Sequence, residues 1–326
     1  MASLASARGA ERLIFGEAYL ADVQELIVFW SEAQAVLARA ASDPLFLSYV
    51  ALGPEGLGLA DDRRRQLMRQ VERELQRMRA LTAAWAQPAI DPMVQGGANV
   101  ALQSAAEQGS RAVLGGALGF ANTNTIRVLA EEVLADTGFA ADSALRVVGR
   151  HLRATQQTLV SEAALNAELL VSEARLERAD ERARRLARLL RAHATQGELV
   201  NINGRFWTLE AYADVVARTR LAEAATAGSY NATLAMGIDL VRVSDHGRTD
   251  PKCDAFAGKV FSISGKDPRF PPLERRPPFH PRCRHALLPF VPELRSEREM
   301  EFAIARSRGE IDPGVGIQEF FGAAAS

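Results

Sequence analysis

Metal-binding and nucleophilic side chains gather in one Pro- and Gly-rich window, Ser244–Pro289, which holds both cysteines and three of the five histidines. In chain order they are His246, Asp250 and Cys253, then, after a gap of 26 residues, His280, Cys283 and His285. Two short ligand groups on turns, joined by a loop, are typical of structural zinc sites, where the metal joins segments with little core of their own. Cys thiolate and neutral imidazole are ligands that Zn²⁺ accepts. Zinc binding is therefore one prediction of this spacing.

The same residues allow two other interpretations. A cysteine is often simply a small buried apolar residue, and Asp250, a less usual ligand in closed zinc sites, would then only cap a turn. A catalytic arrangement would make His280 the base for Cys253 or Cys283, although no third orienting group or oxyanion loop is recognisable. The spacing by itself leaves these interpretations open.

The composition excludes several classes of protein. The chain has 326 residues, 48% apolar and 24% charged, which is ordinary for a folded protein and excludes a wholly disordered or membrane-embedded one. At about 150 residues per domain, two domains are expected. The formal charge is −1, so any nucleic-acid contact must be a local patch. Two cysteines exclude a disulfide framework and fit a reducing compartment, and neither a signal peptide nor a membrane span is expected.

Apolar residues recur with helical spacing through most of residues 1–197. One stripe consists of Leu20, Val23, Ile27 and Trp30, and a second of Leu67, Val71, Leu75 and Met78. Pro88 and Pro92 are expected to end the second helix. In the Gly/Ala-rich stretch that follows, from 96 to 121, small side chains would let helices approach closely. We predict a helical domain over residues 1–197.

Strand and turn signals replace this pattern after Gly197. Asn203-Gly204 lies between two apolar runs, which predicts a hairpin with a type I′ turn. Thr208 would then cap a helix that ends at Gly237. A short strand over 239–243 and a helix over 292–308 follow. The predicted fold class is α+β and mostly α, with a small α+β domain over 198–292, whose Pro-rich loop region zinc would join, and a C-terminal helix and tail over 293–326.

The loop between the two ligand groups carries a local excess of positive charge. Its basic residues are Lys266, Arg269, Arg275, Arg276, Arg282 and Arg284, against Asp267 and Glu274. Such a patch would contact nucleic-acid phosphates without sequence preference, and Lys266, Arg269, Arg275 and Arg276 are the candidates. The alternative is that these charges only keep a Pro-rich loop in solution.

Four motifs that follow one another from Tyr212 to His285 resemble a known family. They are Tyr212-Ala-Asp-Val-Val-Ala-Arg218-Thr219, Gly237-Ile-Asp-Leu-Val-Arg-Val-Ser244-Asp-His246, Cys253-x4-Gly258-Lys-Val-Phe-Ser-Ile-Ser-Gly265 and Pro277-Pro-Phe-His280-Pro-Arg-Cys283-Arg-His285. In this order they resemble phage minor capsid protein 2, a family related to the Mu F and SPP1 gp7-type head morphogenesis proteins. The resemblance covers roughly residues 197–292.

The resemblance implies a structural, non-enzymatic minor capsid protein of a tailed phage or prophage. Such a protein associates with the portal protein and other capsid proteins at the portal vertex, in several copies, and assists head assembly, DNA packaging or delivery. It contacts packaged DNA through phosphates. It resides in the virion, and in the host cytoplasm during assembly. Residues 198–292 would be its head-morphogenesis-like domain.

The chain departs from the family pattern at Asp250, where relatives commonly have the first Cys of Cys-x-x-Cys. A retained zinc site would therefore use Asp250 or His246 beside Cys253, His280 and Cys283, with His285 as a further candidate ligand. Two alternative functions stay open. One is an enzyme related to ADP-ribosyltransferases, in which Arg218 would contact NAD, and the other is a non-specific DNA-binding module.

Overall fold

The computed structural model describes residues 14–110, 117–167, 197–245, 251–312 and 315–323. They fall into two compact units, each described by itself below. We call the unit of Met1–Val23, Ala86–Glu132 and Val215–Ser326 the sheet unit, and the unit of Gln24–Trp85 and Val133–Asp214 the hairpin unit. The domain boundaries at 197/198 and 292/293 stay predictions.

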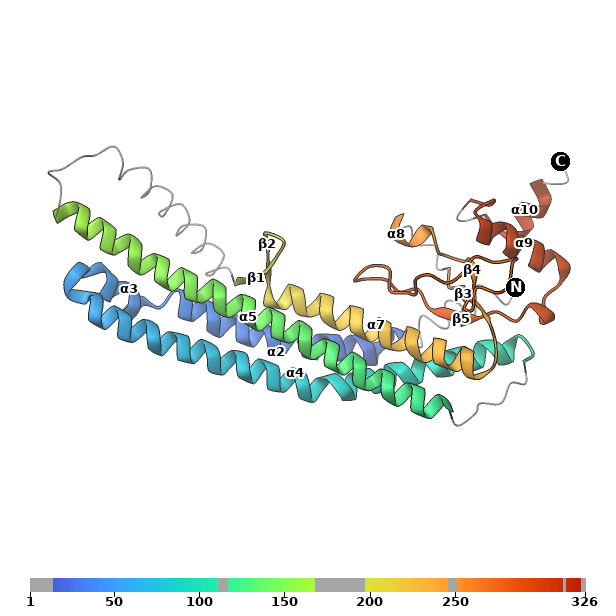
Figure 1. Cartoon of the computed structure of the whole chain (residues 1–326), viewed down its shortest axis with the longest axis horizontal. Helices are drawn as coiled ribbons and strands as arrows, with labels where there is room; N and C mark the ends of the chain where they lie inside the picture. The colour runs from blue at the N-terminus through green and yellow to red at the C-terminus, as the bar shows by residue number, and fades with distance from the viewer. Residues whose placement is uncertain (1–13, 111–116, 168–196, 246–250, 313–314, 324–326) are drawn as a thin grey trace. The chain divides into compact units, whose positions relative to one another are not determined.

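Long helices dominate the described residues, with two small antiparallel sheets (Figure 1). The helices are α2 (Glu17–Ala41), α3 (Pro44–Ala51), α4 (Leu57–Glu107), α5 (Ala117–Ala167), α7 (Leu209–Ala235), α8 (Pro251–Asp254), α9 (Glu297–Arg308) and α10 (Ile317–Ala323), with 3-10 turns at Gly53–Gly56 and Pro292–Leu294. The strands are β1 (Glu198–Ile202), β2 (Arg205–Thr208), β3 (Leu240–Val243), β4 (Val260–Ser262) and β5 (Leu287–Pro289). The α+β, mostly α fold class is therefore confirmed. None of the described helices combines the length and apolarity that crossing a bilayer requires.

The two predicted apolar stripes differ in outcome. The α4 stripe is confirmed, since Leu67, Val71, Leu75 and Met78 are all buried. In α2, Trp30 is buried and donates its indole N–H to Thr82 Oγ1 at 3.0 Å, but Leu20 is 46% exposed. Leu26, rather than Ile27, has no exposed surface. The α2 stripe is therefore confirmed at Val23 and Trp30, whereas the neighbouring Tyr19 and Leu26 are buried in place of Leu20 and Ile27.

Pro88 and Pro92 lie inside α4, so the expectation that they end this helix is wrong. A proline within a helix removes a main-chain hydrogen bond and costs about 3 kcal/mol. Both prolines are exposed, whereas Ala89, Ile90 and Val94 between and beside them are buried. The apolar face continues across the prolines, and its burial offsets their cost.

The predicted hairpin and the helix that follows it are confirmed; the hairpin and the start of the helix lie in the hairpin unit. β1 and β2 pair antiparallel, and Asn203 and Gly204 have φ angles of 50° and 83°, as a type I′ turn requires. Thr208 Oγ1 accepts from the backbone N–H of Ala211 at 3.0 Å and so caps α7. At the other end of α7, in the sheet unit, Gly237 has a φ of 72° and follows the last turn, as predicted.

Helices α4 and α7 meet backbone to backbone within the sheet unit. A Cβ added to Gly97 would lie 1.9 Å from the carbonyl oxygen of Ala225, and one added to Gly228 would lie 1.9 Å from that of Val94. Each glycine is thus required by the other helix, because no side chain fits in this contact. Close approach in the Gly/Ala-rich stretch is therefore confirmed at Gly97.

The three-stranded sheet has the order β4-β3-β5, with all pairs antiparallel. One face packs Val241, Val243, Phe261 and Leu287 in a cluster with both cysteines. The other packs Leu240, Val260, Phe270 and Phe290 against Ala303 of α9. Side chains of successive strand residues point to opposite faces, so the short apolar strands carry two different cores.

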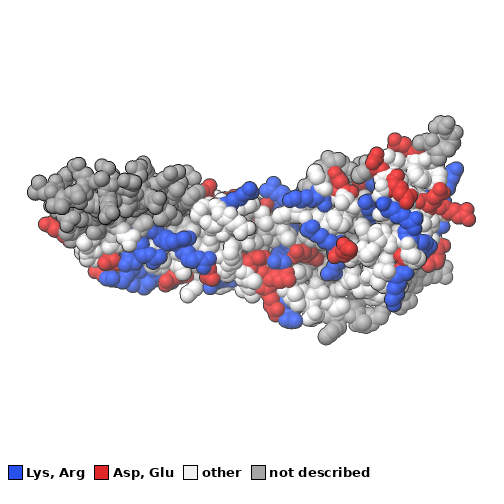
Figure 2. All heavy atoms as spheres, turned by 45° about the horizontal axis from the view of Figure 1, so that its top comes forward, with Lys and Arg blue, Asp and Glu red and all other residues white. Residues whose placement is uncertain are grey.

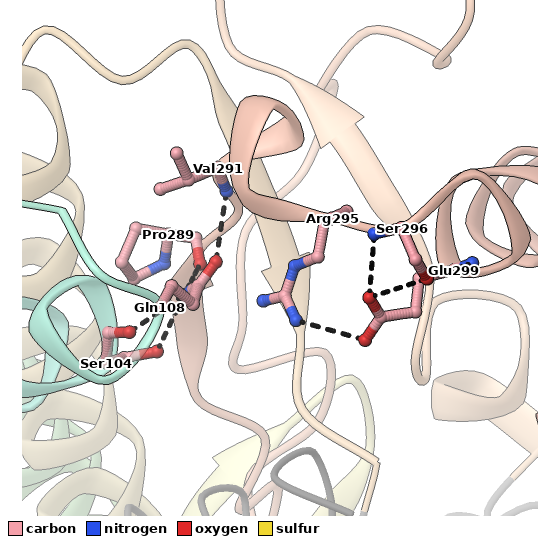
Figure 3. Close-up of polar contacts among 7 residues, drawn as sticks. All are labelled: Ser104, Gln108, Pro289, Val291, Arg295, Ser296 and Glu299. Atoms are coloured by element: carbon pink, nitrogen blue, oxygen red, sulfur yellow. Dashed lines mark hydrogen bonds and ion pairs between the residues drawn. The ribbon is translucent and has the colours of Figure 1, made fainter.

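Gln108, just after α4, holds the end of this helix to the chain beyond β5 (Figure 3). Its Nε2 donates to the carbonyl oxygens of Ser104 and Pro289, both at 2.9 Å, and its Oε1 accepts from the N–H of Val291 at 3.1 Å. The side-chain amide thus pairs with main-chain groups that the sheet leaves unpaired at this edge.

A break after the 3-10 turn divides the helix predicted over 292–308. Ser296 begins α9 with a capping box, in which Ser296 and Glu299 each accept from the other's backbone N–H, and Gly309 ends it with a φ of 80°. Helix α9 is bonded to the sheet, because the N–H of Val260 donates to Ser307 Oγ at 2.9 Å. The ring of Phe320 in α10 lies 5.7 Å from that of Phe302, so α10 packs on α9.

Candidate metal centre

Two short turns position the predicted ligands in the sheet unit. Cys253 lies in α8, which is a single helical turn. The carbonyl oxygen of Cys253 accepts from the N–H groups of Phe256 and Ala257. The chain then returns to the sheet through Gly258, whose N–H donates to Val243 O at 3.0 Å. The second turn closes where the N–H of Cys283 donates to His280 O at 3.0 Å.

The structure brings Cys253, His280 and Cys283 together, with one ligand atom from each within 4.8 Å of the others. The two Sγ atoms are 3.9 Å apart. Two thiolates on a tetrahedral zinc, at Zn–S distances of about 2.3 Å, lie about 3.8 Å apart. Two sulfurs and one imidazole are also the donor set that zinc prefers. The three residues therefore fit a zinc ion without rearrangement of the cysteines.

The other predicted ligands, His285, His246 and Asp250, are not part of this three-residue group. His285 is buried, and its Nδ1 lies 3.4 Å from Cys283 Sγ, so it hydrogen-bonds a candidate ligand but is not a member of the three-residue group. A hydrogen bond of this kind orients a thiolate and tunes its affinity for metal. His246 and Asp250 lie outside the described residues.

Apolar packing also joins the two turns. The rings of Phe256, three residues after Cys253, and Phe279, directly before His280, are stacked 4.1 Å apart. Cys253 and Cys283 are 1% and 4% exposed, inside this cluster. Reactive cysteines are partly exposed, so this burial argues against the thiol nucleophile that the sequence left open. The stacked rings and the buried thiols hold the two turns together, and a metal ion bound by Cys253, His280 and Cys283 would add to this packing.

The basic loop uses part of its charge within the chain. Arg269 forms a two-point ion pair with Asp267, through Nε at 3.0 Å and Nη2 at 2.6 Å, and this guanidinium lowers the pKa of the Asp267 carboxyl. Arg275 donates to Phe279 O at 2.9 Å, and the guanidinium of Arg276 lies 4.4 Å from the ring centre of Tyr230. Arg275 and Arg276 are nevertheless exposed. Figure 2 shows basic and acidic side chains intermixed on the face that it draws.

Asp239 fixes the start of this loop and was not identified from the sequence. Its carboxylate accepts from Ser262 Oγ at 2.6 Å and from the N–H of Ser264 at 2.8 Å. Burial acts to raise the pKa of Asp239, but these hydrogen bonds outweigh it, so the pKa lies below its usual value. An Asp directly before an apolar strand, with one serine at the end of the next strand and a second in the turn that follows, is the signal that the sequence offers.

Comparison with known proteins agrees with the resemblance described above. The family model of phage minor capsid protein 2 matches residues 182–307, so the resemblance is confirmed over that segment. No curated protein and no solved structure matches the chain. The matched segment contains α7, the β4–β3–β5 sheet and all three residues of the candidate metal centre. It supports a structural role in a phage particle.

Proposed function

Because residues 182–307 match the phage minor capsid protein 2 family, we propose that the chain is a minor structural protein of a tailed-phage or prophage head. It associates with the portal protein and other capsid proteins at the portal vertex, in several copies, and assists head assembly, DNA packaging or delivery. It assembles in the host cytoplasm and resides in the virion. The single observation that carries this proposal is the family match.

Purified particles of the phage that encodes the chain test this role. We expect mass spectrometry to detect it in DNA-filled heads at fewer copies than the major capsid protein. Cryo-electron microscopy without imposed symmetry is expected to place its density next to the portal. Particles that contain the portal protein but lack this chain would contradict the proposal.

We propose that Cys253, His280 and Cys283 hold a structural zinc ion, with Asp250 or His246 as the fourth ligand. The 3.9 Å separation of the two sulfurs supports this assignment. When bound, the ion would cross-link the α8 turn to the turn at 280–283. His285 would act one step away from the metal, by donating a hydrogen bond from Nδ1 to the Cys283 thiolate.

Elemental analysis of the full chain, purified without chelator, measures the metal directly. We expect about one zinc per chain, and almost none in Cys253→Ser or Cys283→Ser. The matched variant is His285→Gln, which removes a neighbour of the ligands and not a ligand; it should still bind zinc, about 10–100-fold more weakly. Less than a tenth of an equivalent in the unmodified chain would contradict zinc binding, and equal loss in all three variants would make His285 a ligand.

We also propose that Lys266, Arg275 and Arg276, and to a smaller extent Arg269, contact packaged DNA through phosphates. Arg269 is the weaker candidate because Asp267 already neutralises it. In a gel-shift experiment across a salt series, the double variant Arg275→Gln and Arg276→Gln should lower both the affinity and its salt dependence. Equal salt dependence in the unmodified chain and the double variant would contradict this role.

A further inference from the structure

One arginine lies on the central strand of the sheet, in the otherwise apolar sequence Leu-Val-Arg-Val of β3. Arg242 lies opposite Val260 of β4 and Leu288 of β5. Directly opposite residues of paired strands point to the same face of a sheet. Val260 packs with Leu240 and Ala303 in the cluster under α9. Arg242 therefore points to the α9 face, away from the face that carries the two cysteines.

Two further arginines act on Arg242 from the α9 side, and each already has a carboxylate partner. Nη1 of Arg295, just before α9, lies 3.6 Å from Glu299 Oε1 (Figure 3). Nη2 of Arg306, in the last turn of α9, lies 2.5 Å from Asp245 Oδ2. Among the described residues the cluster thus contains three cations and two carboxylates, and each carboxylate forms its ion pair with an arginine other than Arg242.

Arg242 is the cation of this cluster that has no direct partner among the described residues. Among the described residues it forms no hydrogen bond or ion pair. Burial, and then repulsion by Arg295 and Arg306, outweighs the attraction of Asp245 and Glu299 and lowers the pKa of Arg242 to about 10. The side chain therefore still carries its charge at neutral pH. The Nε of Arg295 is also buried and has no hydrogen-bond partner in the described part of the chain. Leaving such donors unpaired is costly, and an acceptor between them would remove that cost.

We propose that Arg242, with Arg295 and Arg306 beside it, binds a phosphate group. A guanidinium presents paired N–H donors that match two oxygens of a phosphate, and one bound negative charge would balance the excess positive charge of the cluster. The phosphate arrives either free in solution or as part of a DNA backbone, and the chemistry of recognition is the same. The site depends neither on the zinc proposal nor on the capsid role, because it uses other residues on the opposite face of the sheet.

Thermal unfolding of the full chain in sodium phosphate, against sodium chloride of equal ionic strength, tests the site. With inorganic phosphate at about ten times its Kd, we expect the unfolding midpoint to rise by about 3 °C. In Arg242→Gln this phosphate-specific rise should disappear, while the midpoint in chloride should not fall, since the substitution removes an unpaired charge. Isothermal titration should give one phosphate per chain, and at least tenfold weaker binding in Arg242→Gln.

Arg308→Gln is the matched control, because Arg308 is an exposed arginine at the end of α9. It should keep the full phosphate response. Arg295→Gln serves as a second variant, and should weaken phosphate binding even if Arg242→Gln fails to fold. An equal response to phosphate in the unmodified chain and both cluster variants would overturn the proposal, as would an equal response to acetate, which would assign the site to carboxylates.

A second experiment, with duplex DNA, identifies the source of the phosphate. If the site binds the DNA backbone, Arg242→Gln should weaken duplex binding in a gel shift, and inorganic phosphate should compete with the duplex. If the site binds free phosphate alone, Arg242→Gln should leave duplex binding unchanged while titration still loses the inorganic ligand. Either result supports the site, and neither changes the zinc content or the particle content on which the proposed function depends.

Discussion

Two regions of the sheet unit are held together by different physical means. Where α4 meets α7, Gly97 and Gly228 bring the two backbones into direct contact, and a Cβ added at either glycine would overlap a carbonyl oxygen of the other helix. Around the β4–β3–β5 sheet, thiols, an imidazole, an amide and guanidinium groups make the contacts. The first region requires that Gly97 and Gly228 carry no side chain, and the second requires specific polar side chains.

The two regions are expected to respond differently to solution conditions. Backbone contact between helices depends on shape, so it does not change with metal, anions or moderate pH. The interactions of thiols, imidazole, carboxylates and arginines do depend on metal, anions and pH. We therefore expect solution conditions to alter the sheet region while the α4–α7 contact stays intact, and each prediction below tests one side of this contrast.

The largest effect is expected from Gly228→Ala. Its Cβ would lie 1.9 Å from the carbonyl oxygen of Val94, a backbone atom that cannot move without displacing α4. We expect a loss of about 3 kcal/mol in the free energy of unfolding, at the upper end of overpacking costs. Gly97→Ala should cause a similar loss, because its Cβ would lie at the same distance from the carbonyl oxygen of Ala225. Chemical denaturation measures both.

Gly96→Ala is the control for this prediction. Gly96 precedes Gly97 in α4, but an added Cβ there meets nothing within 4 Å. Alanine should therefore stabilise the helix by about 0.5–1 kcal/mol, as expected for Gly→Ala in a helix interior. If Gly96→Ala and Gly97→Ala changed stability equally, the backbone contact would not be the reason for glycine at 97.

A middle-sized effect is expected from Gln108→Ala. The substitution leaves the carbonyl oxygen of Pro289 and the N–H of Val291 without their partner. Each is a part-buried main-chain group, so we expect a loss of about 1–3 kcal/mol in the free energy of unfolding. Gln103→Ala is the control, because Gln103 is exposed and, among the described residues, its side chain bonds only Glu107 on the same helix. If Gln108→Ala lowered the free energy of unfolding no more than Gln103→Ala does, the Gln108 contact would not stabilise this region.

Sequence patterns predicted the local features of the fold well. The buried stripe from Leu67 to Met78, the Asn203-Gly204 turn and the glycine after α7 follow from the chemistry of adjacent residues, and the structure contains all three. Proline normally ends a helix, but Pro88 and Pro92 lie inside α4, because the apolar face of this helix continues across them. A local rule fails where burial supplied by distant segments outweighs it.

Contacts between distant residues were only partly predictable. Cys253, His280 and Cys283 could be grouped because their types share one chemistry. Gln108 offers no such signal, since glutamine on a helix is usually exposed and its partners lie about 180 residues away. Arg242 is visible as a lone charge in an apolar strand, but its importance depends on how the acids near Arg306 are paired, which only the structure gives.

The smallest effect concerns Asp239, and it depends on pH. Its folded-state pKa is lowered by hydrogen bonds from Ser262 and Ser264, against the opposing effect of burial. A group whose pKa is lowered by folding stabilises the folded state above its unfolded pKa of about 3.9. That contribution is lost as the pH falls through the lower folded-state pKa. We expect Asp239→Asn to cost about 1 kcal/mol at pH 7 and to lose less stability than the unmodified chain between pH 4.5 and pH 2.5.

Denaturation at a series of pH values measures this contribution, and Asp254→Asn is its control. Asp254 lies in the same unit, but its carboxylate accepts no hydrogen bond from the described residues, so Asp254→Asn should not show the loss of stability at pH 7 that Asp239→Asn shows. Gly228→Ala should lower the profile equally at every pH, because a clash between a Cβ and a carbonyl oxygen does not titrate. If Asp239→Asn also shifted the profile by the same amount at every pH, its carboxylate would act through packing alone, and this part of the sheet region would respond to pH no more than the α4–α7 contact does.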